Sequence, residues 1–325
     1  MTGVFVQTNE TNANRVLAFA RGDDGTLTKL GEYATGGAGD GVPHLTSQGS
    51  VVLSRDGRQL LVTNAGSGDV SFFAVEEDGL RLVETAPTGA APKSLAEYDG
   101  LIAVLNTGDR SLTLLPAGET IALEAKDPAQ VGFSPDGRTL VVTDRGTDAI
   151  YTFPVRDGRL GDALATPSSG PTPYGFAFTT KGTLVVTEAF GAQRGKAAAS
   201  SYVLRDGGVS AVTRSAGNGR SEICWAVVTT DDRYAFTTNF ADGAVSRYAI
   251  AADGSIALED AVAASSVEGS TGLRDEDLTA DGRFLYAIDA DAQRIFGWQV
   301  GDGGSLAPVG SWDGVPATVA GIAAA

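Results

Sequence analysis

The sequence predicts an all-β fold, a ring of seven four-stranded antiparallel blades, and three observations support it. A short strand with a polar last residue recurs along the whole chain at spacings of 38 to 55 residues, which is the range of propeller repeats. A glycine-containing turn recurs in step with that strand. No helical periodicity persists for three turns anywhere in the chain. We therefore expect residues 1–325 to form a single seven-bladed β-propeller domain.

The clearest copy of the repeat lies at 128–161. Its first strand is the apolar segment 130–134, and the turn that follows contains Gly137, which tolerates a positive φ. The segment 139–143 is rich in β-branched residues and predicts the second strand. The segment 150–155 alternates with a period of two and predicts the third strand, which leads through a second tight turn into the fourth.

The second strand of most repeats ends on Asn or Asp. A residue type shared by most copies is expected to be structural, because short polar side chains accept hydrogen bonds from nearby backbone N–H groups. The seven positions are Asn9, Asn64, Asn106, Asp144, Glu188, Asn239 and Asp289. Several of these oxygens could together bind calcium as an alternative, but we expect neither a metal nor a cofactor.

The two ends of the chain predict how the ring closes. The N-terminus begins at a second strand, whereas the segment 316–322 resembles the start of the repeat at 128–161. We therefore expect the C-terminal strand to join the N-terminal blade, which would remove the free sheet edges. The small residues of 195–201, GKAAASS, are interpreted as a loop.

Composition limits the classes of partner and the compartment. Forty acidic against 24 basic residues give a net charge of −16, which argues against nucleic acid or an anionic membrane as the partner. The single cysteine, Cys224, excludes an internal disulfide and a Cys-rich metal site. We find no signal peptide and no run near the roughly 18 apolar residues of a membrane helix. We expect a cytoplasmic protein that binds a small molecule, and its oligomeric state stays open.

The repeat motifs SRDGRQLLVTN, SPDGRTLVVTD and TADGRFLYAID resemble those of the lactonase-type seven-bladed β-propeller family. That family includes the propeller type of bacterial 6-phosphogluconolactonase and the fungal 3-carboxy-cis,cis-muconate cyclase. The segments SQG at 47–49, GPTPYGFAF at 170–178 and VVTEAFG at 185–191 are similar to those of many further members. The resemblance covers nearly the whole chain and implies an open-faced pocket for a small lactone or carboxylate that is often anionic.

From this resemblance we expect an enzyme that acts on a small lactone or an unsaturated carboxylic acid at the mouth of the central channel. The reaction would be lactone hydrolysis or the related cyclisation or isomerisation. One alternative is a tailoring cyclase or lyase in a specialised biosynthetic pathway. The other is a non-catalytic propeller that binds a small molecule or a protein.

Three residues are candidates for catalysis. Glu188 replaces the usual short residue with a longer carboxylate, which favours either acid/base chemistry or an anchor for the enlarged loop 189–196. His44 is the only histidine and has a pKa suited to proton transfer, although an exposed linker histidine is the alternative. Arg274 could bind a carboxylate or stabilise an oxyanion through parallel hydrogen bonds, or it could only neutralise the acids beside it.

Positions at the start of the first strands are expected to face the mouth of the channel and to bind substrate. Lys93 could assist Arg274 in binding a carboxylate. Tyr174 and Trp225 could form an aromatic wall for the ligand, although packing between blades is the alternative for Trp225. Glu276 and Asp277 replace apolar residues or glycine, so their charges should be unfavourable unless they are paired or face the channel. The predicted binding residues are Lys93, Gln130, Tyr174, Trp225, Asp275 and Glu276.

Overall fold

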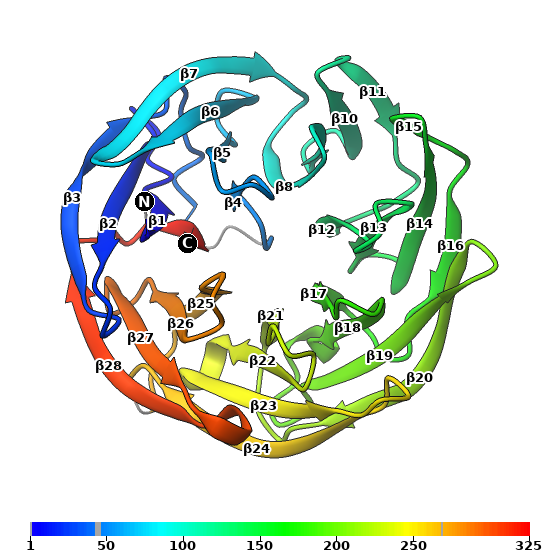
Figure 1. Ribbon diagram of the computed structural model, residues 1–325. Coiled ribbons are helices and arrows are strands. Elements are labelled where there is room, and N and C mark those ends of the chain that lie inside the picture. Colours follow the sequence, from blue (N-terminus) through cyan, green and yellow to red (C-terminus); the bar gives the residue numbers. More distant parts are fainter. Residues whose placement is uncertain (1, 43–46, 268) are drawn as a thin grey trace.

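The computed structural model describes residues 2–42, 47–267 and 269–325. Within these residues the strands form seven antiparallel sheets, which are arranged as blades around a central axis (Figure 1). Helical structure among them is limited to three short 3-10 turns, η1 (Phe190–Ala192), η2 (Phe240–Asp242) and η3 (Asp302–Gly304). The predicted seven-bladed β-propeller is confirmed.

Each blade has four strand positions, from the innermost strand at the channel to the outermost strand at the rim. The innermost strands are β29 (Ala320–Ala324), β4 (Val51–Leu53), β8 (Pro92–Tyr98), β12 (Pro128–Phe133), β17 (Pro173–Phe178), β21 (Ile223–Val228) and β25 (Leu273–Leu278). The second strands are β1 (Gly3–Gln7), β5 (Gln59–Asn64), β9 (Leu101–Asn106), β13 (Thr139–Asp144), β18 (Thr183–Glu188), β22 (Tyr234–Asn239) and β26 (Phe284–Asp289).

The third and outermost strands complete the blades. The third strands are β2 (Arg15–Arg21), β6 (Asp69–Glu76), β10 (Ser111–Leu115), β14 (Ala149–Arg156), β19 (Ala198–Arg205), β23 (Ala244–Ile250) and β27 (Arg294–Val300). The outermost strands are β3 (Leu27–Ala34), β7 (Gly79–Pro87), β11 (Glu119–Ala122), β20 (Gly208–Gly217), β24 (Ile256–Ser265) and β28 (Leu306–Asp313), and in the fourth blade β15 (Arg159–Leu160) and β16 (Leu164–Pro167).

The loop interpretation of 195–201 is wrong from Ala198 onward, where β19 begins. Alanine has a weak preference for strands, so the segment carried little local signal. Its small side chains are nevertheless buried, and Ala199 packs with Ala235 and Tyr248 of the next blade. Packing between blades therefore sets this strand, and that packing is not visible in the local sequence.

The hydrophobic core consists of layers between neighbouring blades. Along β5, Leu60 and Val62 pack against the first blade, and Leu61 points the other way and packs against the third blade. This alternation is the period of two that a strand covered on both faces requires. Full burial of such side chains stabilises the fold by about 1.5 to 3 kcal/mol each.

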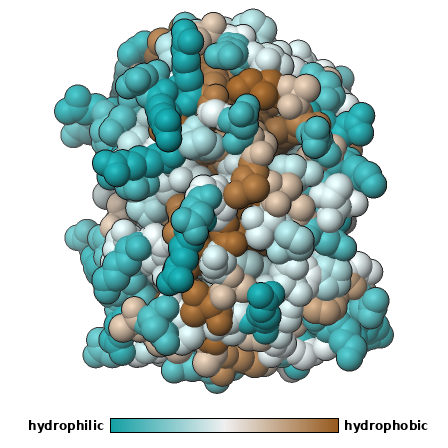
Figure 2. Space-filling model, turned by 90° about the vertical axis from the view of Figure 1, so that its right-hand side faces the viewer, coloured by the Kyte–Doolittle hydropathy of each residue, from teal (hydrophilic) through white to brown (hydrophobic). Residues whose placement is uncertain are grey.

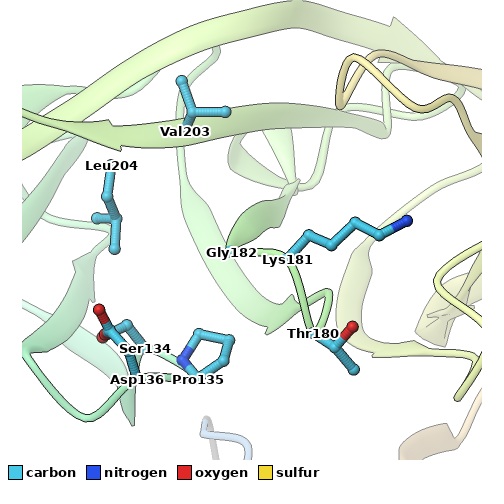
Figure 3. Close-up of a pocket in the computed structure, with 8 residues that line it drawn as sticks. All are labelled: Ser134, Pro135, Asp136, Thr180, Lys181, Gly182, Val203 and Leu204. Carbon is cyan, nitrogen blue, oxygen red and sulfur yellow. The ribbon is translucent and has the colours of Figure 1, made fainter.

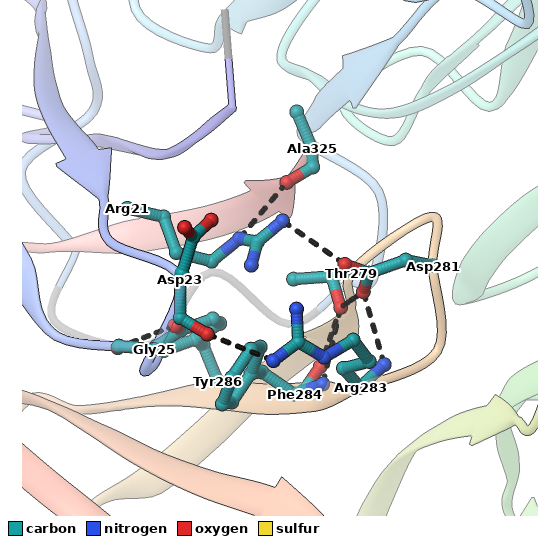
Figure 4. A network of polar contacts seen from close by, with 9 residues as sticks. All are labelled: Arg21, Asp23, Gly25, Thr279, Asp281, Arg283, Phe284, Tyr286 and Ala325. Carbon is teal, nitrogen blue, oxygen red and sulfur yellow. Dashed lines mark hydrogen bonds and ion pairs between the residues drawn. The ribbon is translucent and has the colours of Figure 1, made fainter.

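The ring closes between the first and seventh blades, as predicted. The C-terminal strand β29 pairs antiparallel with β1, with Phe5 opposite Ala323. Figure 4 shows polar contacts between the first and seventh blades. Arg21 Nη2 lies 3.2 Å from Asp281 Oδ2, and the Tyr286 hydroxyl donates to the Gly25 carbonyl at 2.6 Å. The sheet edges that a linear array would leave open are therefore paired.

The rim seen in Figure 2 carries mainly hydrophilic side chains, with apolar side chains between them. Most of the exposed large apolar residues belong to the outermost strands, as Leu164 of β16 does. No helix in the described part of the chain is long and apolar enough to cross a membrane.

Candidate active site

The central channel has two distinct ends. In each blade the innermost strand runs from the face that bears the linkers between blades, here termed the upper face, to the face that bears the turn into the second strand, here termed the lower face. Residues at the start of these strands, such as Arg274, therefore lie toward the upper face. Residues at their ends, such as Leu53, lie toward the lower face.

The segment Ser47–Gly49 crosses the channel, and we term it the crossbar. The Gln48 side-chain amide donates to the Ala226 carbonyl at 2.8 Å and accepts from the Ala226 N–H at 3.1 Å. The Gln48 carbonyl accepts from Ser94 Oγ at 2.6 Å, on the third blade. One segment therefore joins the third blade to the sixth across the channel, and Gln48 and Gly49 border the cavity described below.

Two further contacts fix the crossbar. The indole Nε1 of Trp225 donates to the Ser47 carbonyl at 3.3 Å. Gly175 provides the space for Gln48, because a Cβ at this glycine would lie only 2.6 Å from Gln48 Oε1. The SQG and PYG segments, which contribute to the family resemblance, therefore fit against each other in the channel.

Above the crossbar, Arg274 is buried without a hydrogen-bond partner. It is 1% exposed, and its Nε, Nη1 and Nη2 atoms have no hydrogen-bond acceptor among the described residues. The guanidinium carbon lies 5.3 Å from the centroid of the Phe240 ring. Burial lowers the pKa of Arg274, and the charge of Asp291 opposes that shift. A buried cation in these surroundings is stabilised by an anion that accepts its hydrogen bonds.

Aromatic residues and a second arginine surround this position. The rings of Tyr174 and Trp225 meet edge to face at 5.8 Å, and Arg145 lies over the Tyr174 ring at 4.8 Å. Arg145 Nη2 donates to Asp127 Oδ1 at 2.7 Å. Burial raises the pKa of Tyr174 and of Cys224, so both keep their protons at neutral pH. We term the following set the upper cluster: Arg145, Tyr174, Cys224, Trp225, Phe240 and Arg274.

The predicted residues Lys93 and Glu188 lie elsewhere. Lys93 Nζ is 3.0 Å from Asp40 Oδ2, and both side chains are partly buried. The carboxylate of Glu188 is fully buried inside the fifth blade and accepts three hydrogen bonds. Its donors are the Gly170 N–H at 2.8 Å, Ser200 Oγ at 2.5 Å and Ser215 Oγ at 2.7 Å. These contacts are those of an anchor for the outer strands of its own blade.

The predicted proton carrier His44 lies outside the described residues. Its role stays a prediction.

Below the crossbar lies a cavity of about 360 Å³, which we term the axial cavity. Gln48 and Gly49 border it above, and the inner strands form its walls. Asp275 and Glu276 are buried in this wall, and Asp277 beside them is half-buried. The sequence predicted that Glu276 and Asp277 would be paired or would face the channel, and both border the axial cavity. They do so below the crossbar, on the side away from Arg274.

The pKa values of these carboxyl groups are raised. Burial raises the pKa of Asp275, and the charge of Asp277 adds to the shift. Burial and both neighbouring aspartates raise the pKa of Glu276. Burial raises the pKa of Asp277 to about 7, although its carboxylate accepts hydrogen bonds from the backbone N–H groups of Ala324 and Leu278.

Gln130, predicted to bind substrate, also borders the axial cavity. Its amide accepts from the Phe176 N–H at 2.6 Å and donates to the Phe176 carbonyl at 3.0 Å. Gln48 makes the same pair of bonds with Ala226. Each amide thus completes the hydrogen bonding of an inner strand edge that no further strand covers.

A second hollow of about 350 Å³ lies on the lower face between the fourth and fifth blades (Figure 3). Turn residues border it, and its two charged side chains, Asp136 and Lys181, are exposed. Its charged groups therefore remain solvated, and it is less suited to chemistry than the channel.

The sequence did not identify several contributors to the channel, among them Arg145, Phe240 and Gln48. Arg145 and Phe240 directly follow the polar ends of β13 and β22, where several other blades have alanine or threonine. Large residues at this position were a signal that comparison of the repeats could have found. Gln48 gave no such signal, because its partner Ala226 is 178 residues away.

Comparison with known proteins identifies the family. The family model described as lactonase, 7-bladed beta-propeller, matches residues 4–114, 94–197 and 188–318. No curated protein matches the chain.

Solved structures show the same fold. A periplasmic gluconolactonase from Pseudomonas aeruginosa superposes with a TM-score of 0.72 at 18% identity, over 98% of each chain. A proposed 6-phosphogluconolactonase from Bacteroides fragilis gives a TM-score of 0.74 at 18% identity, over 99% of this chain and 97% of that one. A functionally unknown protein from Desulfotomaculum acetoxidans gives a TM-score of 0.74 at 12% identity, over 99% of this chain and 98% of that one. At these identities the likeness supports the fold alone, whereas the family model covers nearly the whole chain. The chain therefore belongs to the seven-bladed β-propeller lactonase family.

Proposed function

We propose that this protein hydrolyses a small lactone at the upper end of its channel, with Arg274 as the residue that binds the anionic part of the reacting molecule. Membership of the lactonase family supports hydrolysis as the reaction class. The observation that carries the site is the buried guanidinium of Arg274, whose three nitrogens have no hydrogen-bond acceptor among the described residues.

The chemistry of lactone opening suits such a group. Water gives one proton to a base as it adds to the carbonyl carbon, and the carbonyl oxygen takes up the negative charge. The ring C–O bond then breaks, the base returns that proton to the ring oxygen, and the hydroxy acid formed releases one proton at neutral pH. Arg274 can donate two parallel hydrogen bonds to the oxyanion or to the product carboxylate. A donor of this kind typically contributes a factor of about 10² to 10³ to the rate.

The other members of the upper cluster support binding. Tyr174 and Trp225 present aromatic surface beside Arg274. Arg145 adds a second guanidinium, which pairs with Asp127 and whose Nε has no hydrogen-bond acceptor among the described residues. We assign to Glu188 the role of an anchor, because its oxygens already accept three hydrogen bonds. The proposed proton carrier is then His44.

The test is proton release from a panel of lactones, which includes 6-phosphogluconolactone and simple five- and six-membered rings. Arg274→Met should lower kcat/KM by about 10²-fold or more, and Arg274→Lys should recover part of the loss. His44→Ala should lower kcat, whereas Glu188→Gln should affect stability more than kcat.

Arg58→Met is the matched control, because Arg58 is exposed at the lower face and the change also removes one guanidinium. It should leave turnover unchanged. Turnover by the wild type that Arg274→Met does not reduce would refute the assigned site. If no lactone is opened faster than in buffer, the proposal of hydrolysis is wrong, and a binding propeller is left.

A further inference from the structure

We propose that the axial cavity is a second site, which binds a small organic ammonium ion. It lies below the crossbar, and the residues that form it differ from those of the upper cluster. The inference is therefore independent of the proposed lactone hydrolysis.

The charge of the cavity wall has one sign. Glu97 of β8 and the acids of β25 contribute four carboxyl groups, and the described wall contains no Lys, Arg or His. Glu97 already accepts hydrogen bonds from the backbone N–H groups of Arg55 and Gly100. Asp277 likewise accepts hydrogen bonds from the backbone N–H groups of Ala324 and Leu278. The charge available to a ligand is therefore mainly that of Asp275 and Glu276.

Glu276 supplies the second observation. It is 1% exposed, it borders the cavity, and neither of its carboxylate oxygens accepts a hydrogen bond of normal geometry from the described residues. The backbone N–H of Thr238 is near enough only to oppose the rise of its pKa. Asp275 Oδ2 lacks a donor as well. Buried carboxylates in this condition destabilise the protein unless a proton or a cation compensates them. An alkylammonium group has three N–H donors and can supply hydrogen bonds to these acceptors.

The apolar part of the cavity wall favours an organic cation over a metal ion. Val52, Leu53, Leu95 and Val131 give the cavity an apolar side, on which an alkyl chain would be desolvated favourably. In the described part of the chain, no three Asp, Glu, His or Cys side chains converge as metal ligands do. A cavity of about 360 Å³ also exceeds the need of a single metal ion and lies in the range of small-molecule sites.

The experiment is isothermal titration calorimetry of the wild type with n-butylammonium and 1,4-diammoniobutane chlorides at pH 8, with NaCl and CaCl₂ at equal ionic strength as references. We expect saturable binding of at least one ammonium ion. The affinity should fall tenfold or more at pH 5, because the raised pKa values of the acids that face the cavity favour their neutral forms as the pH falls.

Variants locate the binding. Glu276→Gln and Asp275→Asn should each weaken it tenfold or more. Asp162→Asn removes one charge from an exposed position and should leave it unchanged. Arg274→Met should also leave it unchanged, which separates this site from the lactone site. A fold check by circular dichroism accompanies each variant, and the wild-type pH dependence needs no variant.

Three results would overturn the inference. They are an absence of saturable ammonium binding at pH 8, equal binding by folded Glu276→Gln, and tighter binding of calcium than of either ammonium ion.

Discussion

Glu188 and Glu276 are both fully buried glutamates, but their carboxylates have different surroundings. Glu188 accepts three hydrogen bonds, from one backbone N–H and two serine hydroxyls. Glu276 accepts no hydrogen bond of normal geometry from the described residues, although the backbone N–H of Thr238 is near enough to oppose the rise of its pKa, and it has two aspartates beside it. A buried carboxylate stabilises a fold when its acceptors are satisfied and destabilises it when they are not.

The same conservative change should therefore have opposite effects at the two positions. Glu188→Gln replaces an acceptor oxygen by a donor that faces donors, and it should lower the free energy of unfolding by about 1 to 3 kcal/mol. Glu276→Gln removes an uncompensated charge and should raise that free energy by about 1 to 3 kcal/mol at pH 8. Urea denaturation of the two variants without added ammonium salts measures both. A loss of stability in Glu276→Gln would mean that its carboxylate has a compensating partner.

At the scale of the element, the inner strands depend on side chains from distant parts of the chain. Gln48 completes the hydrogen bonding of β21 at Ala226, and Gln130 that of β17 at Phe176. In both cases one amide bonds to the N–H and the carbonyl of a single residue, as a neighbouring strand would. The crossbar is therefore part of the propeller's hydrogen-bonded structure as well as a border of the axial cavity.

Replacing Gln48 should expose the edge of β21 to solvent and leave that of β17 bonded, and replacing Gln130 should do the reverse. Gln48→Ala should speed hydrogen exchange at the Ala226 N–H, and Gln130→Ala should do so at the Phe176 N–H. Each should lower the free energy of unfolding by about 1 to 3 kcal/mol, because backbone groups lose buried partners. Hydrogen exchange followed by mass spectrometry or NMR measures this, and the two variants serve as controls for each other. Equal exchange at both amides in both variants would contradict these local roles.

The sequence predicts the strands far better than the channel, for a physical reason. Strand and turn signals are local, so β13 was predicted to within one residue, and seven internal copies reinforced the assignment. The channel is built from contacts between blades. Arg274, Tyr174 and Trp225 were identified because alignment on the repeat placed them at or beside the starts of inner strands, and they do lie close together. The anchoring contacts of Glu188 and the pairing of Lys93 with Asp40 depend on residues far away in sequence, which no local pattern indicates.

At the scale of the whole molecule, opposite pKa shifts predict how stability depends on pH. Turn aspartates such as Asp56, Asp136 and Asp281 have lowered pKa values, because each accepts a hydrogen bond from a nearby Ser or Thr hydroxyl, against some burial. The stability they contribute is present above their unfolded pKa near 4 and is lost as the pH falls through their folded values.

The acids of the axial cavity act in the opposite direction. Asp275 and Glu276 have raised pKa values, and that of Asp277 is about 7. The folded state therefore holds protons that the unfolded state has released above about pH 4, and stability falls as the pH rises from there through 7. The two trends together place maximum stability between about pH 4 and 5, at or below the acidic end of the usual range of about 5 to 8. Urea midpoints measured from pH 3 to 9 without added ammonium salts test this. The combined variant Asp275→Asn, Glu276→Gln and Asp277→Asn should remove the decline above pH 5, because it leaves the turn aspartates in place. An unchanged decline in that variant would assign the pH dependence to groups outside the channel.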